Sequence, residues 1–299
     1  MIKIVEAGQR DRIGISETAQ KGRVVVTETR TTPKTTTSPL DDATVTFRDR
    51  VQASGGSIKD GSLKNLYDPI LRAIKGFSGI GLSDLVFFGS GGAVEVNDGS
   101  ISRLFDASGN ENDVTQGDTA KQPTKGTYNG RVSPIYDFSD DVLGTSIGDL
   151  PDQGTIIVAA DSVLGENEAW IDLTDGTGTN TGFMLFGDSN DSLVGRVRSG
   201  GSNVNAKGPK SGGKVSASTI YDASSSRLEV IENGSVVATE SPGTLDNAIS
   251  ELRYGALQRL PDSYAARGDG LPIALVLSVP LSESQHSELR KIIADYYSL

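Results

Sequence analysis

The chain has 299 residues, no cysteine and a formal net charge of −11, from 28 Lys and Arg against 39 Asp and Glu. The lack of cysteine excludes disulfides, thiolate metal sites and thiol catalysis, and the acidic balance argues against a nucleic-acid-binding surface. No apolar run approaches the roughly 20 residues that a helix needs to cross a bilayer, so no membrane partner is expected. The charge is uneven, because residues 1–50 carry a net +2 and residues 51–299 carry −13.

Residues 1–44 are predicted to form an extended anchoring arm. Val24, Val25 and Val26 form a β-branched run, and seven threonines with Pro33 follow within residues 27–38. Threonine and proline favour extended backbone, but the stretch has too little apolar area to fold alone. The alternatives are a disordered tail and an arm held by neighbouring chains, and we expect the second.

Residues 45–100 are predicted to form a small helical and linker region. Val45 to Ala53 places Phe47 and Val51 four residues apart before the helix stop at Gly55. A second helix is expected over 63–75, with apolar residues near one face. Pro69 follows Asp68 as a first-turn proline follows a cap, which favours a helix start at this point. A glycine-rich link at 89–92 then leads into a β-rich region.

Strand signals recur at short spacing from about residue 94 onwards. The clearest is the Asn233-Gly234 pair between two β-rich runs, which favours a hairpin because a type I′ turn needs positive φ at both central residues. Glycine, asparagine, aspartate and serine fill the gaps between runs, as turns require. Strands are predicted at 101–105, 132–138, 154–160, 168–173, 182–187, 192–198, 215–221, 227–232, 235–239, 251–256 and 272–279.

Many short strands separated by turns predict a mainly β fold, an antiparallel β-sandwich of the jelly-roll kind. One helix is expected after it, at 282–297. Ser282 with Gln285 fits a capping box, and Leu289, Ile292, Ile293 and Tyr296 form one apolar stripe. We expect this helix to pack on the sandwich.

Three segments within residues 101–299 resemble the concanavalin A-like lectin and glucanase sandwich in its laminin G-like form. They are Leu104–Asp113 with the Gln122-Pro123 and Asn129-Gly130-Arg131 turns after it, the Asn233-Gly234 hairpin, and 270–279 with the capped helix. The resemblance implies a concanavalin A-like fold for 101–299. It does not fix the activity, because this fold hosts lectins, glycosidases and structural modules.

A second resemblance lies nearer the N-terminus. The run Phe47-Arg-Asp-Arg-Val-Gln-Ala-Ser-Gly-Gly56 and the short apolar helix after it are similar to a segment of tailed-bacteriophage virion proteins that precedes a sandwich of this kind. The resemblance implies a particle component whose arm and helical region dock on neighbours while the acidic sandwich faces outward.

The first candidate site is the loop Asp106–Asp113, which carries closely spaced oxygen side chains and superficially resembles a calcium loop. An EF-hand-type loop needs glycine at its sixth position and glutamate at its twelfth, but counting from Asp106 gives Glu111 and Gly117. An Asx-rich turn that caps its own backbone is therefore favoured over a metal site.

The second candidate is the acidic run from Glu166 to Asp172. On a regular strand Glu168, Trp170 and Asp172 share a face, and Trp170 is either a sugar-stacking platform or core packing. Glu168 and Asp172 would then lie about 13 Å apart along the strand. Glycosidase carboxyl groups are about 5 Å apart in retaining enzymes and no more than about 9.5 Å apart in inverting ones. The spacing therefore argues against hydrolysis.

Three further candidate sites are each argued against by their residue spacing or by a missing motif. Asp140 and Asp141 are adjacent, so on a strand their side chains point to opposite faces. His286 is the only histidine and has no serine-and-acid motif around it. The stretch Ser199–Gly213 is rich in glycine but lacks the phosphate-binding motif, and it is interpreted as a mobile loop.

The sequence thus predicts a non-enzymatic virion protein of a tailed bacteriophage, with no catalytic, cofactor or metal residues. Residues 1–100 would bind other virion subunits, and a homo-oligomer is expected. The sandwich at 101–299 would decorate the capsid or belong to the tail or fibre, in contact with host surface glycans. The alternative is a glycan-binding, lectin-like module with glycoside hydrolase activity.

Overall fold

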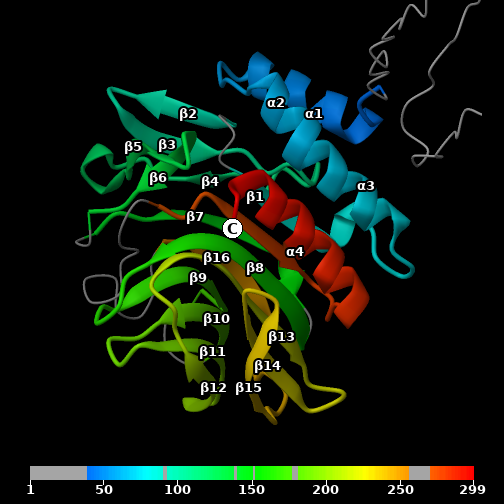
Figure 1. Cartoon of the computed structure of the whole chain (residues 1–299), viewed down its shortest axis with the longest axis vertical. Helices are drawn as coiled ribbons and strands as arrows, with labels where there is room; N and C mark the ends of the chain where they lie inside the picture. Colours follow the sequence, from blue (N-terminus) through cyan, green and yellow to red (C-terminus); the bar gives the residue numbers. More distant parts are fainter. Residues whose placement is uncertain (1–38, 90–92, 138–139, 151, 177–180, 256–269) are drawn as a thin grey trace, which may run out of the picture. The chain divides into compact units, whose positions relative to one another are not determined.

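The computed structural model describes residues 39–89, 93–137, 140–150, 152–176, 181–255 and 270–299. Most of the predicted arm therefore lies outside the described residues. Leu40–Leu299 form one compact unit. Figure 1 shows two β-sheets in this unit with helices gathered along one side. None of the described helices is long and apolar enough to cross a membrane.

The predicted antiparallel sandwich is confirmed. Among the described residues, a six-stranded sheet has the order β1-β17-β8-β13-β14-β15, and an eleven-stranded sheet has the order β12-β11-β10-β9-β16-β7-β4-β3-β5-β6 with β2 beside β3. The strands are β1 Leu85–Gly89, β2 Val94–Asn97, β3 Ser100–Leu104, β4 Val114–Thr115, β5 Thr124–Tyr128, β6 Arg131–Ile135, β7 Leu143–Leu150, β8 Gln153–Ser162, β9 Glu168–Thr174, β10 Gly182–Gly187, β11 Ser192–Ser199, β12 Ser202–Pro209, β13 Gly213–Asp222, β14 Arg227–Glu232, β15 Ser235–Glu240, β16 Ile249–Tyr254 and β17 Ile273–Leu277.

Each of the eleven predicted strands overlaps an observed one, and the Asn233-Gly234 turn joins β14 to β15 with φ of 50° and 87°. One loop prediction was wrong. The Ser199–Gly213 stretch is not a loop, because residues 202–209 form β12 and pair with β11 from Ser202 to Pro209. Its polar residues suit a strand at the edge of the sheet, where one side faces water.

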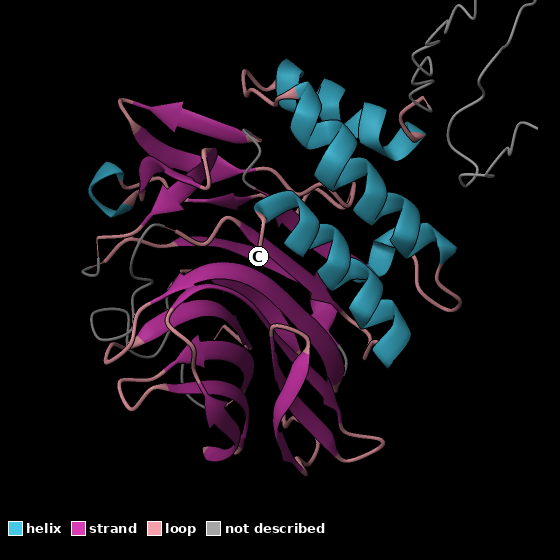
Figure 2. Ribbon diagram, in the orientation of Figure 1, coloured by secondary structure: helices cyan, strands magenta, loops and turns pink. Residues whose placement is uncertain are grey.

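The six-stranded sheet is buried on both faces over β1, β17 and β8. One face packs against the eleven-stranded sheet through residues such as Ile156, Val158 and Trp170. The other face, which carries Ile157 and Leu275, packs against the helices. Figure 2 shows α1, α3 and α4 together on one side of the sheets. The helices are α1 Asp42–Ala53, α2 Asp60–Ser62, η1 Leu63–Tyr67, α3 Asp68–Gly76, η2 Leu82–Asp84, η3 Thr119–Lys121 and α4 Glu283–Tyr297.

The expected division at residue 100 is not a boundary of packing. Phe47 and Val51 of α1 and Ile70 and Ile74 of α3 are buried in the same cluster as the α4 side chains. The next segment, β1, pairs with β17 at the edge of the six-stranded sheet. Residues 45–89 therefore belong to the same folded unit as the sandwich.

The C-terminal helix begins and packs largely as predicted. Ser282 and Gln285 form the capping box, and Leu289, Ile293, Tyr296 and Tyr297 are buried. Ile292 was wrongly placed on the buried stripe, since it is only partly buried. An apolar stripe on a helix includes more than one residue per turn, so its width does not decide which of two adjacent residues is buried. Here Ile293, and not Ile292, faces the sheet.

Replacing Ile293 by Ala should therefore lower the free energy of unfolding by roughly 2 to 5 kcal/mol, as for other truncations of buried aliphatic side chains. Ile292→Ala is the matched control in the next position and should cost clearly less. Denaturant unfolding of the two variants measures the difference. Equal losses, or dissociation of an oligomer without loss of stability, would show that the helix packs differently.

Candidate functional site

The Asp106 side chain is the most heavily bonded group in the Asp106–Asp113 loop, for which an Asx-rich turn was predicted. It is fully buried, and its carboxylate accepts hydrogen bonds from the N–H of Phe87 and Ser108 at 2.9 Å each. It also accepts from the Ser108 hydroxyl at 2.7 Å and from the N–H of Asn112 at 3.1 Å. Burial raises the pKa of Asp106, and these donors act in the opposite direction. The four donors occupy the positions from which a cation would bind, so these bonds agree with an Asx-rich turn.

The same loop covers the free edge of β1. Besides the Phe87 N–H that bonds to Asp106, the Phe87 carbonyl accepts from the N–H of Ala107 at 2.8 Å. The Asn110 amide donates to the Leu85 carbonyl at 2.9 Å, and the Tyr67 hydroxyl donates to the Gly89 carbonyl. A buried strand edge with open hydrogen-bonding groups would cost free energy, and the loop removes that cost.

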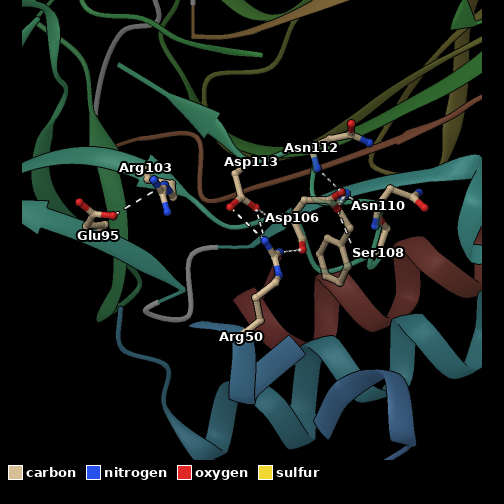
Figure 3. A network of polar contacts seen from close by, with 9 residues as sticks. Arg50, Glu95, Arg103, Asp106, Ser108, Asn110, Asn112 and Asp113 are labelled. Carbon is tan, nitrogen blue, oxygen red and sulfur yellow. Dashed lines mark hydrogen bonds and ion pairs between the residues drawn. The ribbon is translucent and has the colours of Figure 1, made fainter. Parts of the chain in front are cut away.

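Arg50 connects this loop to helix α1. Its guanidinium forms an ion pair with Asp113 at 2.9 Å, and it also donates to the Asp106 carbonyl. Figure 3 shows the Arg50 side chain reaching from the helix to both aspartates. The guanidinium also lies 5.7 Å from the centroid of the Phe105 ring. The Asp106–Asp113 loop is therefore a structural junction between the helices and the sandwich.

Glu168 is enclosed by polar groups of the protein itself. Its side chain and that of Lys210 are both completely buried, with 3.0 Å between Nζ and Oε2. The Lys210 ammonium also donates to the carbonyls of Val163 and Glu166 at 2.8 and 2.9 Å. Burial raises the pKa of Glu168, while Lys210 and the Val163 N–H lower it. The buried pair is fully compensated, because all three ammonium protons are bonded, and it leaves no access for a substrate.

The prediction that Glu168 and Asp172 share a face of their strand was wrong. Phe186 of β10 pairs with Ala169, but Leu185 pairs with Ile171, so Trp170 is an extra residue in a β-bulge. A bulge moves every later side chain to the other face. Asp172 accordingly pairs with Met184 on the face that points away from the other sheet. The two carboxylates cannot act on one substrate, and Trp170 is buried in the core rather than a sugar platform.

The outer face of the eleven-stranded sheet carries polar pairs that the sequence did not single out. Arg196 donates to Asn205 at 2.6 Å, and Arg198 donates to Asn203 at 2.9 Å. The Arg196 guanidinium lies 4.7 Å from the Phe186 ring centroid. These pairs come from neighbouring strands β11 and β12, so only the sheet register brings them together.

An acidic cluster lies just before β7. One carboxylate oxygen from each of Asp137, Asp140 and Asp141 lies within 4.8 Å of the others. The prediction that Asp140 and Asp141 point apart was wrong, because the two residues do not lie in a strand. Burial, followed by Asp137 and Asp140, raises the pKa of Asp141 to about 6, although the Asp137 N–H donates to it. Three neighbouring acids do not by themselves make a functional site.

Among the described residues, hollows open between the sheets and on the eleven-stranded sheet. A cleft of about 370 Å³ lies between the sheets, lined by η2, β1 and β17 on one side and by Ile147 and Gly148 of β7 on the other. A smaller hollow of about 250 Å³ lies on the eleven-stranded sheet, next to Glu251 and Arg253 of β16. Neither is lined by Glu168, Asp172 or the acidic cluster.

The fold and its contacts define a β-sandwich protein in which a layer of helices packs against one sheet. The sequence matches no family model, and no curated protein aligns with it significantly. Solved structures with some likeness include a carbohydrate-binding module, CBM40, of an intramolecular trans-sialidase from Ruminococcus gnavus bound to α2,3-sialyllactose. It has 14% identity and a TM-score of 0.39 over 50% of this chain and 92% of that one.

A sialidase from Trypanosoma rangeli in complex with the inhibitor DANA has 11% identity and a TM-score of 0.46. The alignment covers 68% of this chain and 32% of the sialidase, so the chain spans about a third of that enzyme. Likeness at this level carries no activity or ligand from those proteins to this chain.

His286 lies in the first turn of α4 and is buried against the sheet. Its Nε2 lies 2.8 Å from the Ser218 hydroxyl of β13. Burial lowers the pKa of His286 to about 4, with Arg290 and Arg227 acting in the same direction and Glu229 against it. The imidazole is therefore neutral at pH 7, and it serves as a packing and hydrogen-bonding group.

This depressed pKa makes stability depend on pH. Below about pH 6.5 the unfolded chain binds a proton at His286 that the folded chain does not bind until about pH 4, so stability is lost as the pH falls between these values. The loss should reach roughly 3 kcal/mol. His286→Gln, which has no such proton, should show a smaller loss in thermal unfolding from pH 7.5 to 4. Identical pH profiles would mean that His286 is not buried in the folded state.

Proposed function

We propose that the chain is a non-enzymatic structural component of a tailed-bacteriophage particle, attached by its N-terminal arm and exposing the sandwich. The observation that carries the proposal is the place of the segment 47–56, whose sequence resembles phage virion proteins. Phe47 and Val51 are buried in the helical layer, and Arg50 is bonded to the Asp106–Asp113 loop. The segment thus joins the arm to a rigid body.

The buried contacts narrow the part of the chain that would bind neighbouring subunits. The apolar side chains of residues 45–89 are used in the chain's own core, so they are not free to dock elsewhere. Attachment would therefore rest on residues 1–44, which carry a formal net charge of +1 against −12 for residues 45–299. A homo-oligomer held by this arm is part of the proposal.

The test is to locate the chain in purified particles of the phage or prophage that encodes it. Full-length chain should appear in particle mass spectrometry and at one defined place in immunogold images. A variant lacking residues 2–38 should fold with unchanged circular dichroism but be lost from particles, because the arm is gone and the body is intact. Absence of the full-length chain from particles, or equal incorporation of both, contradicts the proposal.

A second candidate function is glycan binding without cleavage. The observation that favours it is the 370 Å³ cleft, whose volume falls within the usual range of small-molecule sites, about 300 to 1,000 Å³. Hydrolysis is disfavoured, because Glu168 is sealed by Lys210 and Asp172 lies on the other face of the strand. Such a module on a particle would contact the host surface.

A further inference from the structure

The cleft between the sheets exists because the chain turns away from β7. Strand β4 pairs with β7 only at Thr115 and Gly144. Just before β4, Asp113 and Asn112 are drawn into the bonds around Asp106 instead of continuing along β7. Among the described residues, 146–150 therefore have a strand neighbour on one side only, and the cleft opens on the other.

The floor of the cleft is aliphatic. Val86 and Val276 come from the six-stranded sheet and Ile147 from the eleven-stranded sheet, and all three belong to the core. Their side chains are at least nine-tenths buried. This floor suits the C–H face of a ligand rather than a charged or fully solvated group.

The rim of the cleft carries uncharged polar groups with unused hydrogen-bonding capacity. Within the described chain, the Asn112 carboxamide and the Ser83 hydroxyl make no hydrogen bond, and Gln153 uses only its amide, which donates to the Ser278 carbonyl at 3.3 Å. Figure 3 shows the Asn112 side chain directed away from the Asp106 carboxylate. Carboxamides combine donors and an acceptor in one plane, which matches pairs of neighbouring hydroxyls.

The charge of the cleft selects against anions. Asp84 is the one ionisable side chain that lines it among the described residues. Its carboxylate already accepts bonds from the Gly81 N–H at 2.8 Å and the Ser278 hydroxyl at 3.2 Å. With no lysine or arginine in the described lining, and a formal charge of −13 over residues 51–299, an anionic ligand would be repelled.

From this geometry we infer that the cleft between β1 and β7 is a binding site for a neutral saccharide ring. The ring's C–H face lies on Val86 and Ile147, and its hydroxyls bond to Asn112, Gln153 and Asp84. The inference rests on glycan binding, the second candidate function, and it names both the site and the ligand class. Acidic sugars, including sialic acids and uronates, are excluded from this site.

The experiment uses the full chain and ligand-observed NMR titration with D-glucose and D-galactose against their uronates, which differ only at C6. The neutral sugars should bind, and the uronates should bind several-fold more weakly at low salt, with a gap that narrows as salt is added. Asn112→Ala should weaken neutral-sugar binding about fivefold, the effect of one lost hydrogen bond. Asn190→Ala, in an exposed turn elsewhere, should not change it.

A blocking variant tests the place of the site. Gly148 lines the cleft, and a Cβ there would meet no atom within 4 Å, so Gly148→Phe should fold normally and add a bulky ring beside the cleft. It should reduce binding at least tenfold, while Gly243→Phe, at an equally open glycine away from the cleft, should leave binding unchanged.

Each failure has a separate meaning. Neutral-sugar binding that survives Gly148→Phe overturns the site but retains glycan binding. Uronates that bind as tightly as the neutral sugars overturn the ligand class. No binding of any of these sugars by the parent chain overturns the inference and the glycan-binding function together.

Discussion

The Asp106 carboxylate is the constraint on which the rest of the structure depends. This buried carboxylate bonds the edge of β1 and shapes its own loop. The backbone of the same residue bonds to Asp113 and Arg50, and this pair holds helix α1. The same loop holds the chain away from most of β7, so that β4 pairs with β7 at one position only. The cleft between the sheets opens along the unpaired part of β7. A buried carboxylate is tolerated only when its hydrogen bonds are satisfied, so the loop conformation and the charge depend on each other.

Local patterns in the sequence were enough to predict the elements that carry a strong local signal. The Asn233-Gly234 turn and the Ser282–Gln285 cap both lie where they were expected. The missed strands lack such a signal. Strand β1 is buried at every position, so it shows no alternation, and β12 is a polar edge strand between glycines.

The site depends on contacts that no local pattern encodes. Lys210 is 42 residues from Glu168, and His286 is 68 residues from Ser218. A single bulge at Trp170 reversed the predicted side of the strand, since one extra residue moves every later side chain to the other face. Unpaired carboxamides on a cleft rim, such as Asn112, leave no signature in sequence at all.

The central claim is that the helical layer and the sandwich are one cooperative unit joined at the Asp106 loop. Native-state hydrogen exchange at rising denaturant measures it directly, through the amides of Val51 in α1, Ile74 in α3, Phe87 in β1 and Ile157 in β8. The account predicts that all four exchange only through global unfolding, with one common free energy. Exchange of Val51 and Ile74 at a clearly lower free energy than Ile157 would show that the helices are a separate, weakly attached layer, and would contradict it.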